Sequence, residues 1–304
     1  MGLQDDLRMQ WRTGGMVVRL ILINAGVFLA LLLLRLLLLP SAGDLHTAKA
    51  LLDHYVIQWI RSTSDLGMLV TRPWTVVTYM FVQTDIGHIF WNMLMLWFGG
   101  RLFQDLLGSK RLLGNYLLGG LAGFVLFAIS QNVMPGLHGG SLSGIQGASA
   151  AVLSVLVGIA AYRPDMVVNL ILIGPVKLMY VAAVIVLLDL VGIGSGDGVA
   201  HEAHIGGALY GFFAAQQLKR GNDWSLGFVN FLGRLWPFGK ARASKLRVEK
   251  AFVGKPSRND VDYNATKRAK QARVDTILDK ISRSGYDSLS KEEKDFLFKA
   301  SDGK

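Results

Sequence analysis

The sequence predicts an all-α membrane protein with six transmembrane helices and a small soluble helical tail. Its composition is apolar, because 51% of the 304 residues are hydrophobic and only 18% are charged, whereas an average soluble domain carries about 25% charged residues. The charge is also unevenly distributed, since 20 of the 32 Lys and Arg residues follow residue 217. An apolar body therefore precedes a basic tail, and the net charge of +10 does not indicate nucleic-acid binding.

The body divides into six apolar spans. The first, residues 17–39, holds 23 residues, and about 20 suffice to cross a bilayer. It is too long for the apolar part of a signal peptide, and the Pro-Ser-Ala-Gly that follows is a poor cleavage context, so we expect a retained helix. The other five spans are expected at about 86–104, 112–132, 149–162, 166–190 and 199–217.

The distribution of basic residues predicts the orientation. Lys and Arg gather before the first span, between the second and third, between the fourth and fifth, and after the sixth. The connection 131–148 has no charged residue, and the connection 191–203 carries only Asp197 and Glu202. Both termini should therefore be cytoplasmic. An amphipathic helix is expected on the outer surface within 41–73, from the apolar stripe Leu51, Leu52, Tyr55, Val56, Trp59 and Ile60.

The fourth span is unusually short. It has about 14 residues, a helix of roughly 21 Å against a hydrocarbon core of about 30 Å. A Gly-rich, uncharged stretch at 136–147 precedes it. We therefore expect this helix to begin below the outer surface, with protein or a water-filled cavity around the irregular backbone.

Polar side chains open the even-numbered spans. His88 and Asn92 are one helical turn apart in the second span, Ser149 opens the fourth, and His201 and His204 open the sixth. Because the even-numbered spans all run from outside to inside, these residues should share one layer just below the outer face. Small residues should let the fourth and sixth spans approach closely; they are Ala150, Ser154, Gly158, Gly207 and Gly211.

These groups are suited to acyl transfer. Ser149 is the candidate nucleophile and His204 the base that accepts its proton, while His88 and Asn92 are candidate donors to the developing oxyanion. No carboxylate is expected beside His204, since Glu202 is two residues away and lies on a different face of the helix. The sequence therefore predicts a Ser149–His204 dyad.

Other roles for these residues remain open. A serine in an apolar helix commonly bonds a backbone carbonyl, and His88 with Asn92 can link two helices. The segment His201-Glu202-Ala203-His204 is similar to the zinc motif H-E-x-x-H, but its histidines are one residue too close and no third ligand is evident. We therefore expect no metal and no other cofactor. The absence of cysteine excludes thiolate sites and cysteine nucleophiles.

Three segments together resemble the rhomboid family of intramembrane serine proteases. They are TRPWTVVTYMFVQTDIGHIFWNMLMLWFGGRL at 71–102, GASA at 147–150 and AHIGGALYG at 203–211. The resemblance covers about residues 15–217. It implies a six-helix fold with Ser149 as nucleophile, His204 as base, and His88 and Asn92 at the oxyanion. The implied substrates are transmembrane segments of other proteins in the lipid bilayer, with a bacterial inner membrane as the expected location.

The sequence departs from the family pattern at three positions. Ala150 replaces the common Gly after the nucleophile, Leu153 replaces an aromatic residue, and Gln104 replaces a Glu, with Asp105 adjacent. The alternative function is that of a non-catalytic rhomboid-like protein that binds transmembrane clients. Intact Ser149 and His204 argue against this alternative, and the near absence of charges within the spans argues against a transporter.

The expected domain organisation is a membrane domain at 1–217, a basic linker at 218–263 and a cytosolic two-helix module at 264–304. In the linker, the basic run from Lys240 to Lys250 should favour an anionic membrane surface. In the module, an amphipathic helix at 264–283 should be followed by a second helix opened by a capping box from Ser290 to Glu293.

Overall fold

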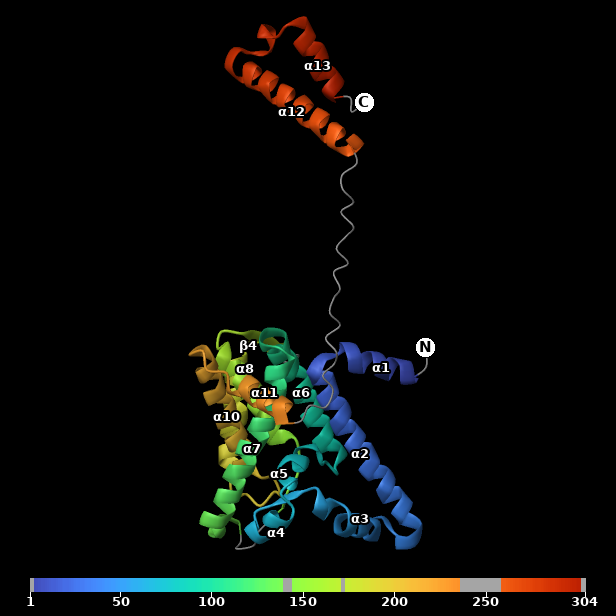
Figure 1. Cartoon of the computed structure of the whole chain (residues 1–304). Helices are drawn as coiled ribbons and strands as arrows, with labels where there is room; N and C mark the ends of the chain where they lie inside the picture. The colour runs from blue at the N-terminus through green and yellow to red at the C-terminus, as the bar shows by residue number, and fades with distance from the viewer. Residues whose placement is uncertain (1–2, 139–143, 171–172, 236–257, 302–304) are drawn as a thin grey trace. The chain divides into compact units, whose positions relative to one another are not determined.

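The computed structural model describes residues 3–138, 144–170, 173–235 and 258–301. The chain forms two compact units, residues 1–237 and 238–304, and each is described by itself. In the first unit the long helices lie side by side (Figure 1). The helices described there are α1 (Leu3–Thr13), α2 (Gly15–Ala42), α3 (Leu45–Tyr55), α4 (Leu66–Thr71), α5 (Thr75–Thr78), α6 (Ile86–Leu107), α7 (Ser109–Val133), α8 (Ser149–Tyr162), α9 (Leu178–Gly192), α10 (His201–Lys219) and α11 (Trp224–Leu235).

Five of the six expected spans coincide with helices to within three residues at either end. They are α2, α6, α7, α8 and α10. Of the described helices, α2 and α7 are long and apolar enough to cross a membrane, and α8 and α9 are shorter apolar helices. The mostly helical fold is therefore confirmed, while the count of six spans stays a prediction.

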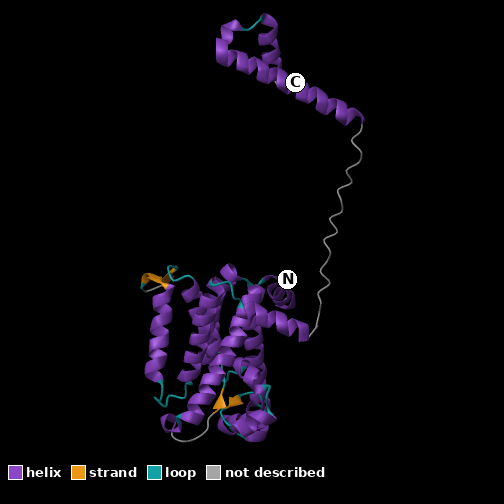
Figure 2. Ribbon diagram, turned by 60° about the vertical axis from the view of Figure 1, so that its left-hand side comes forward, coloured by secondary structure: helices purple, strands orange, loops and turns teal. Residues whose placement is uncertain are grey.

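The fifth span differs from its prediction. The described residues 166–170 and 173–177 do not continue the helix, because strand β3 (Val167–Leu170) pairs antiparallel with β4 (Gly174–Lys177). Gly174 has φ +85°, which other residues rarely adopt, and Pro175 lacks the amide that a helix needs. Helix α9 therefore begins only at Leu178 and has 15 residues. Figure 2 shows this hairpin and the other strand pair at opposite ends of the bundle.

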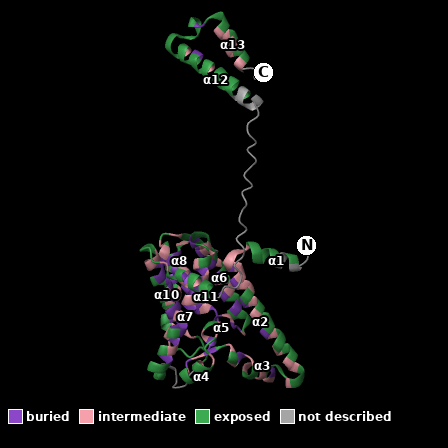
Figure 3. Cartoon of the chain, in the orientation of Figure 1, coloured by how far each residue is buried: buried purple, intermediate pink, exposed green. Residues whose placement is uncertain are grey.

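Helix α8 lies at the centre of the core. Every residue from Ala150 to Ala161 is buried, and α6, α7, α9 and α10 all contact this helix. By contrast, α2 presents a largely exposed apolar face (Figure 3). A polar group within this part of α8, such as Ser154, is thus surrounded by protein.

The predicted close approach of α8 and α10 is confirmed. A methyl group added to Gly211 would lie 2.2 Å from the carbonyl oxygen of Ser154, so the two backbones are in direct contact. Gly207 approaches α8 in the same way. Small side chains on both helices make this contact possible.

The connection between α2 and α6 is folded against the bundle. The expected amphipathic helix is α3, but it ends at Tyr55, and a 3₁₀ turn (η1, Ile57–Trp59) follows. The guanidinium of Arg72 lies 3.9 Å from the centre of the Trp59 ring, and a second 3₁₀ turn, η2, spans Tyr79–Phe81. Strand β1 (Ser62–Thr63) pairs with β2 (Gly144–Ile145), which tethers this connection to the segment leading into α8.

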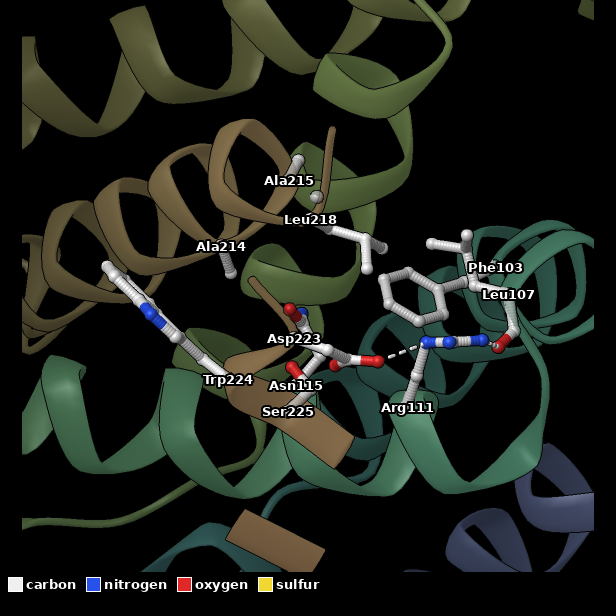
Figure 4. Close-up of a pocket in the computed structure, with 11 residues that line it drawn as sticks. Phe103, Leu107, Arg111, Asn115, Ala214, Ala215, Leu218, Asp223, Trp224 and Ser225 are labelled. Carbon is white, nitrogen blue, oxygen red and sulfur yellow. Dashed lines mark hydrogen bonds and ion pairs between the residues drawn. The ribbon is translucent and has the colours of Figure 1, made fainter. Parts of the chain in front are cut away.

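The expectation of a linker directly after α10 is wrong for residues 224–235, which form α11. This helix packs against α7. Asp223 precedes it and accepts a 2.6 Å hydrogen bond from Nε of Arg111 (Figure 4). A methyl group on Gly114 would lie 2.2 Å from the carbonyl oxygen of Ser225. Helix α11 is therefore part of the first compact unit. The basic run 240–250 lies outside the described residues.

The second unit contains α12 (Arg258–Ser284), a 3₁₀ turn (η4, Tyr286–Ser288) and α13 (Lys291–Ser301). The predicted capping box is confirmed, because the Ser290 amide donates to Glu293 Oε2 at 2.8 Å and the Glu293 amide donates to Ser290 Oγ at 3.3 Å. Ile277 of α12 is buried. Lys280 Nζ lies 2.9 Å from the Glu293 carboxylate and joins the two helices.

Candidate active site

A cavity of about 360 Å³ opens where α6, α8 and α10 begin. Ser149, His204 and His88 all line this cavity, so the prediction that the starts of these helices share one layer is confirmed for these three residues. The remaining lining residues are Tyr79, Ile145, Gln146, Gly147, Ala150, Gly198, Val199, Ala200 and Ala203.

Ser149 and His204 are in direct contact. Ser149 is the first residue of α8, and its Oγ lies 2.6 Å from Nε2 of His204. This distance is that of a strong hydrogen bond. A serine paired in this way with an imidazole has the arrangement of a nucleophile and its base.

The turn before Ser149 is fixed by Gly147. Its amide donates to the carbonyl oxygen of Tyr79 at 2.9 Å, and its φ is +124°. A methyl group at this position would lie 2.8 Å from Cε1 of His88. Only glycine fits both the backbone conformation and the space, and the close packing places His88 against the turn that leads into Ser149.

The expectation that no carboxylate lies beside His204 is wrong. Asp189 of α9 is buried, and its Oδ1 lies 2.6 Å from Nδ1 of His204. Asp189 is the one acidic residue in the expected fifth span. An ionisable residue within an apolar span is a functional candidate by default, so this signal was available in the sequence.

A second histidine binds the same carboxylate. His201 Nδ1 lies 2.8 Å from Oδ1 of Asp189, and its Nε2 lies 3.0 Å from Oδ2 of Asp197. Asp197, in the loop between α9 and α10, also accepts a 2.8 Å hydrogen bond from the Val199 amide. The hydrogen bond from His201 lowers the pKa of Asp197 below its usual value.

The side chains of Asp189, His201 and His204 are also of the types that bind metal ions. Their nitrogen and oxygen atoms lie within 4.8 Å of one another, so the structure places a third possible ligand, which was not evident in the sequence, beside the two histidines. However, each of the nitrogen atoms facing Asp189 is already within hydrogen-bond distance of its Oδ1. The contacts are therefore those of a hydrogen-bonded network.

Asn92 is placed differently from His88. It is buried, is not among the residues that line the cavity, and donates through Nδ2 to Oε1 of Gln83 at 2.8 Å. Gln83 in turn donates to Oδ1 of Asn24 at 3.1 Å. Asn92 thus belongs to a buried chain of side-chain amides that links α6 to α2, and this chain fixes the orientation of its amide group.

Glu202 points away from His204, as expected. It is buried, and its Oε1 accepts a 3.4 Å hydrogen bond from Gln131 of α7. The carboxylate in contact with His204 therefore comes from another helix and is not the one nearest in sequence.

Gln104 has a structural role. Its Oε1 accepts hydrogen bonds from the backbone amides of Met16 at 2.6 Å and Val17 at 3.1 Å. These amides lie in the first turn of α2, where backbone donors have no partner within the helix. Gln104 therefore caps α2 from the end of α6. Ala150 and Leu153, the two other departures from the family pattern, are buried in the core.

Comparison with known proteins supplies an independent observation. A family model described as the Rhomboid domain matches residues 70–220, which include every residue of this site. A second model, described as a family of unknown function, matches residues 259–302 in the tail.

Three curated proteins are similar to this part of the chain. They are "RHOMBOID-like protein 12, mitochondrial" of Arabidopsis thaliana (29% identity; 49% of this chain and 48% of that protein), "Presenilin-associated rhomboid-like protein A, mitochondrial" of Danio rerio (30%; 46% and 36%) and "Rhomboid protease GluP" of Bacillus subtilis strain 168 (28%; 48% and 26%). The matched segments thus span about a quarter to a half of these relatives.

Proposed function

Because this chain belongs to the rhomboid family, whose members are integral membrane proteins, we propose that it is an intramembrane serine endopeptidase. It hydrolyses peptide bonds in or near transmembrane segments of other membrane proteins. The observation that carries this proposal is the 2.6 Å contact between Ser149 Oγ and His204 Nε2 on the wall of a cavity. The protease among the relatives supports it further.

The reaction begins with His204 Nε2 accepting the hydroxyl proton of Ser149. The oxygen then attacks the scissile carbonyl, and negative charge develops on the carbonyl oxygen. His204 next donates the proton to the leaving amine. Water then attacks the acyl enzyme, with His204 accepting a proton from the water and donating it to the Ser149 oxygen as this leaves. Because Ser149 opens α8, the unpaired amides of the first turn favour the negative charge.

His88 is the side chain best placed to help at the oxyanion, since it lines the cavity beside Gly147. Asn92 contributes from one turn further along α6, where Gln83 holds its amide. A donor that meets the developing charge is typically worth a few kcal/mol in the transition state. We therefore assign His88 and Asn92 to the oxyanion site.

Six spans with both termini in the cytoplasm are part of the proposal. This orientation follows from the basic residues that flank the spans, and it puts the cavity near the outer face of a bacterial inner membrane. The substrate then reaches Ser149 from the bilayer, while the cavity supplies the water that hydrolysis needs. Neither a cofactor nor a nucleic acid takes part.

The test is cleavage of a purified transmembrane substrate by the full chain in detergent, compared with Ser149→Ala and His204→Ala. We expect both variants to fold, to bind substrate and to lose nearly all turnover. Folding is checked by thermal unfolding and by elution as a single species. If the wild-type protein binds a transmembrane helix without cleaving it, the chain is a non-catalytic rhomboid-like protein and the proposal is wrong.

A further inference from the structure

We propose that Asp189 is the positioning carboxylate for His204, and that His201, held between Asp189 and Asp197, keeps this carboxylate in place. The site then works as a Ser149–His204–Asp189 triad with a second histidine behind it. This inference rests on the proposed function and adds residues that the two-residue mechanism leaves without a role.

The first step concerns the proton on His204. A neutral imidazole carries its proton on one ring nitrogen only, and the hydrogen bond at one nitrogen decides the state of the other. An ionised carboxylate only accepts hydrogen bonds, so Oδ1 of Asp189, 2.6 Å away, requires the proton on Nδ1 of His204. Nε2 is then left with a lone pair directed at Ser149 Oγ.

The second step concerns charge. When Ser149 loses its proton, His204 becomes a cation, and the carboxylate 2.6 Å away stabilises that cation. In water such a pair is weak, but Asp189 is buried, and charge interactions strengthen as the local dielectric falls. The Nδ1 proton stays on His204 throughout, so Asp189 positions the base and takes no proton.

The third step explains why a carboxylate is tolerated in an apolar helix. A buried charge is costly unless it is paired and hydrogen-bonded. Both ring nitrogens of His201 face carboxylate oxygens, those of Asp189 and Asp197. Since each carboxylate only accepts, the His201 ring that satisfies both contacts is the doubly protonated cation. This cation keeps Asp189 ionised.

The arrangement also joins three elements. Asp189 lies near the end of α9, Asp197 in the following loop and His201 at the start of α10. His204 lies one turn beyond His201 on the same helix, so both imidazoles contact Oδ1 of Asp189 from neighbouring positions. The His201 contacts thereby fix the carboxylate against the helix that carries the base.

The main experiment compares the full chain with Asp189→Asn in detergent. The amide keeps the shape but can donate to His204 Nδ1, which would place the ring proton on Nε2 facing Ser149. We expect kcat to fall at least about 100-fold with KM little changed, because the same substitution in a soluble serine protease lowers kcat about 10⁴-fold. Labelling of Ser149 by a fluorophosphonate should slow in parallel.

The matched control is Glu202→Gln, which removes a buried carboxylate two residues from His204 that faces Gln131 instead. We expect it to keep turnover within about threefold. The ¹⁵N spectrum of the histidine rings is a second measurement, and a purely structural role of Asp189 would leave it unchanged. It should report an Nδ1 proton on His204 in the wild type and its loss or transfer to Nε2 in Asp189→Asn.

Two further variants keep the inference falsifiable if Asp189→Asn folds poorly. Asp189→Ala should be partly rescued by added formate, a small carboxylate that fits the vacated space. Asp197→Asn, at an exposed position, should lower turnover only several-fold. Full turnover by folded Asp189→Asn, with Ser149→Ala inactive, would overturn the inference while leaving the protease proposal intact. Absence of Ser149-dependent cleavage in the wild type would refute both.

Discussion

Gly207 of α10 lies so close to Ala150 of α8 that a methyl group at position 207 would sit 2.1 Å from the Ala150 carbonyl oxygen. Ala150 directly follows the candidate nucleophile, and Gly207 follows the candidate base by less than one helical turn. The contact that holds the two helices together therefore also sets the distance between Ser149 and His204.

The first prediction is that Gly207→Ala lowers both stability and activity. The added methyl group must push α8 and α10 apart, and overpacking of this kind typically costs about 1–3 kcal/mol. A shift of about 1 Å between reacting groups can lower turnover about 100-fold. Thermal unfolding and cleavage rates in detergent provide the measurement.

The control for this prediction is Gly26→Ala, since nothing lies within 4 Å of a methyl group added there on α2. We expect its stability to be unchanged or slightly raised, because alanine favours helix over glycine. If Gly207→Ala and Gly26→Ala had the same thermal stability and the same cleavage rate, the role assigned to the α8–α10 contact would be wrong.

A second prediction separates the two oxyanion candidates. His88→Ala should lower kcat more than it weakens substrate binding, with stability little affected, because His88 lines the cavity. Asn92→Ala should lower kcat and also destabilise the fold by roughly 1–3 kcal/mol, since it leaves the buried Oε1 of Gln83 without its donor. If Asn92→Ala lost stability but kept full turnover, Asn92 would only link helices.

A third prediction concerns the cap on α2. Gln104→Ala removes the acceptor for the Met16 and Val17 amides and should destabilise the membrane domain by about 0.5–2 kcal/mol. Gln104→Glu should restore or exceed the wild-type stability, because a negative charge at a helix N-terminus is favourable. Thermal unfolding of the three proteins in detergent, without any activity assay, tests this order.

The sequence was sufficient to predict most of the fold because hydrophobic runs and their lengths determine where helices lie. It also predicted that Ser149, His88 and His204 lie together, since alternating helix directions put the starts of the even-numbered spans at one end of the bundle. The fifth span was predicted too long because Val167 to Leu170 is as apolar as a helix in lipid. Gly174 and Pro175 are the local signals that the chain turns there.

Asp189 was missed for a different physical reason. It lies on another helix, 15 residues before His204, and contact between them depends on how α9 packs against α10 rather than on spacing within one helix. The sequence predicts a linker at residues 224–235 because basic and Gly residues surround them. Their contact with α7 depends on Gly114 and on the ion pair between Arg111 and Asp223, which no local pattern reveals.

A fourth prediction concerns metal. Because the ring nitrogens of His201 and His204 that face Asp189 are hydrogen-bonded to it, a strong chelator should leave turnover unchanged, and a fluorophosphonate should attach covalently to Ser149. Mass spectrometry of the labelled peptide identifies the residue. Loss of activity on chelation, followed by recovery with zinc, would instead indicate that Asp189, His201 and His204 bind a metal ion.

The last prediction concerns where the catalytic part of the chain ends. Truncation after residue 237, the boundary between the two compact units, should leave cleavage in detergent largely intact, because no candidate catalytic group lies beyond it. Truncation after residue 220 should instead lower thermal stability, since it removes α11 and leaves Arg111 without the Asp223 carboxylate. Arg111→Ala in the full chain is the matched control and should reproduce a part of that loss. Full stability of the protein truncated after residue 220 would show that α11 is dispensable. Loss of activity by the protein truncated after residue 237 would show that the C-terminal module acts on the active site.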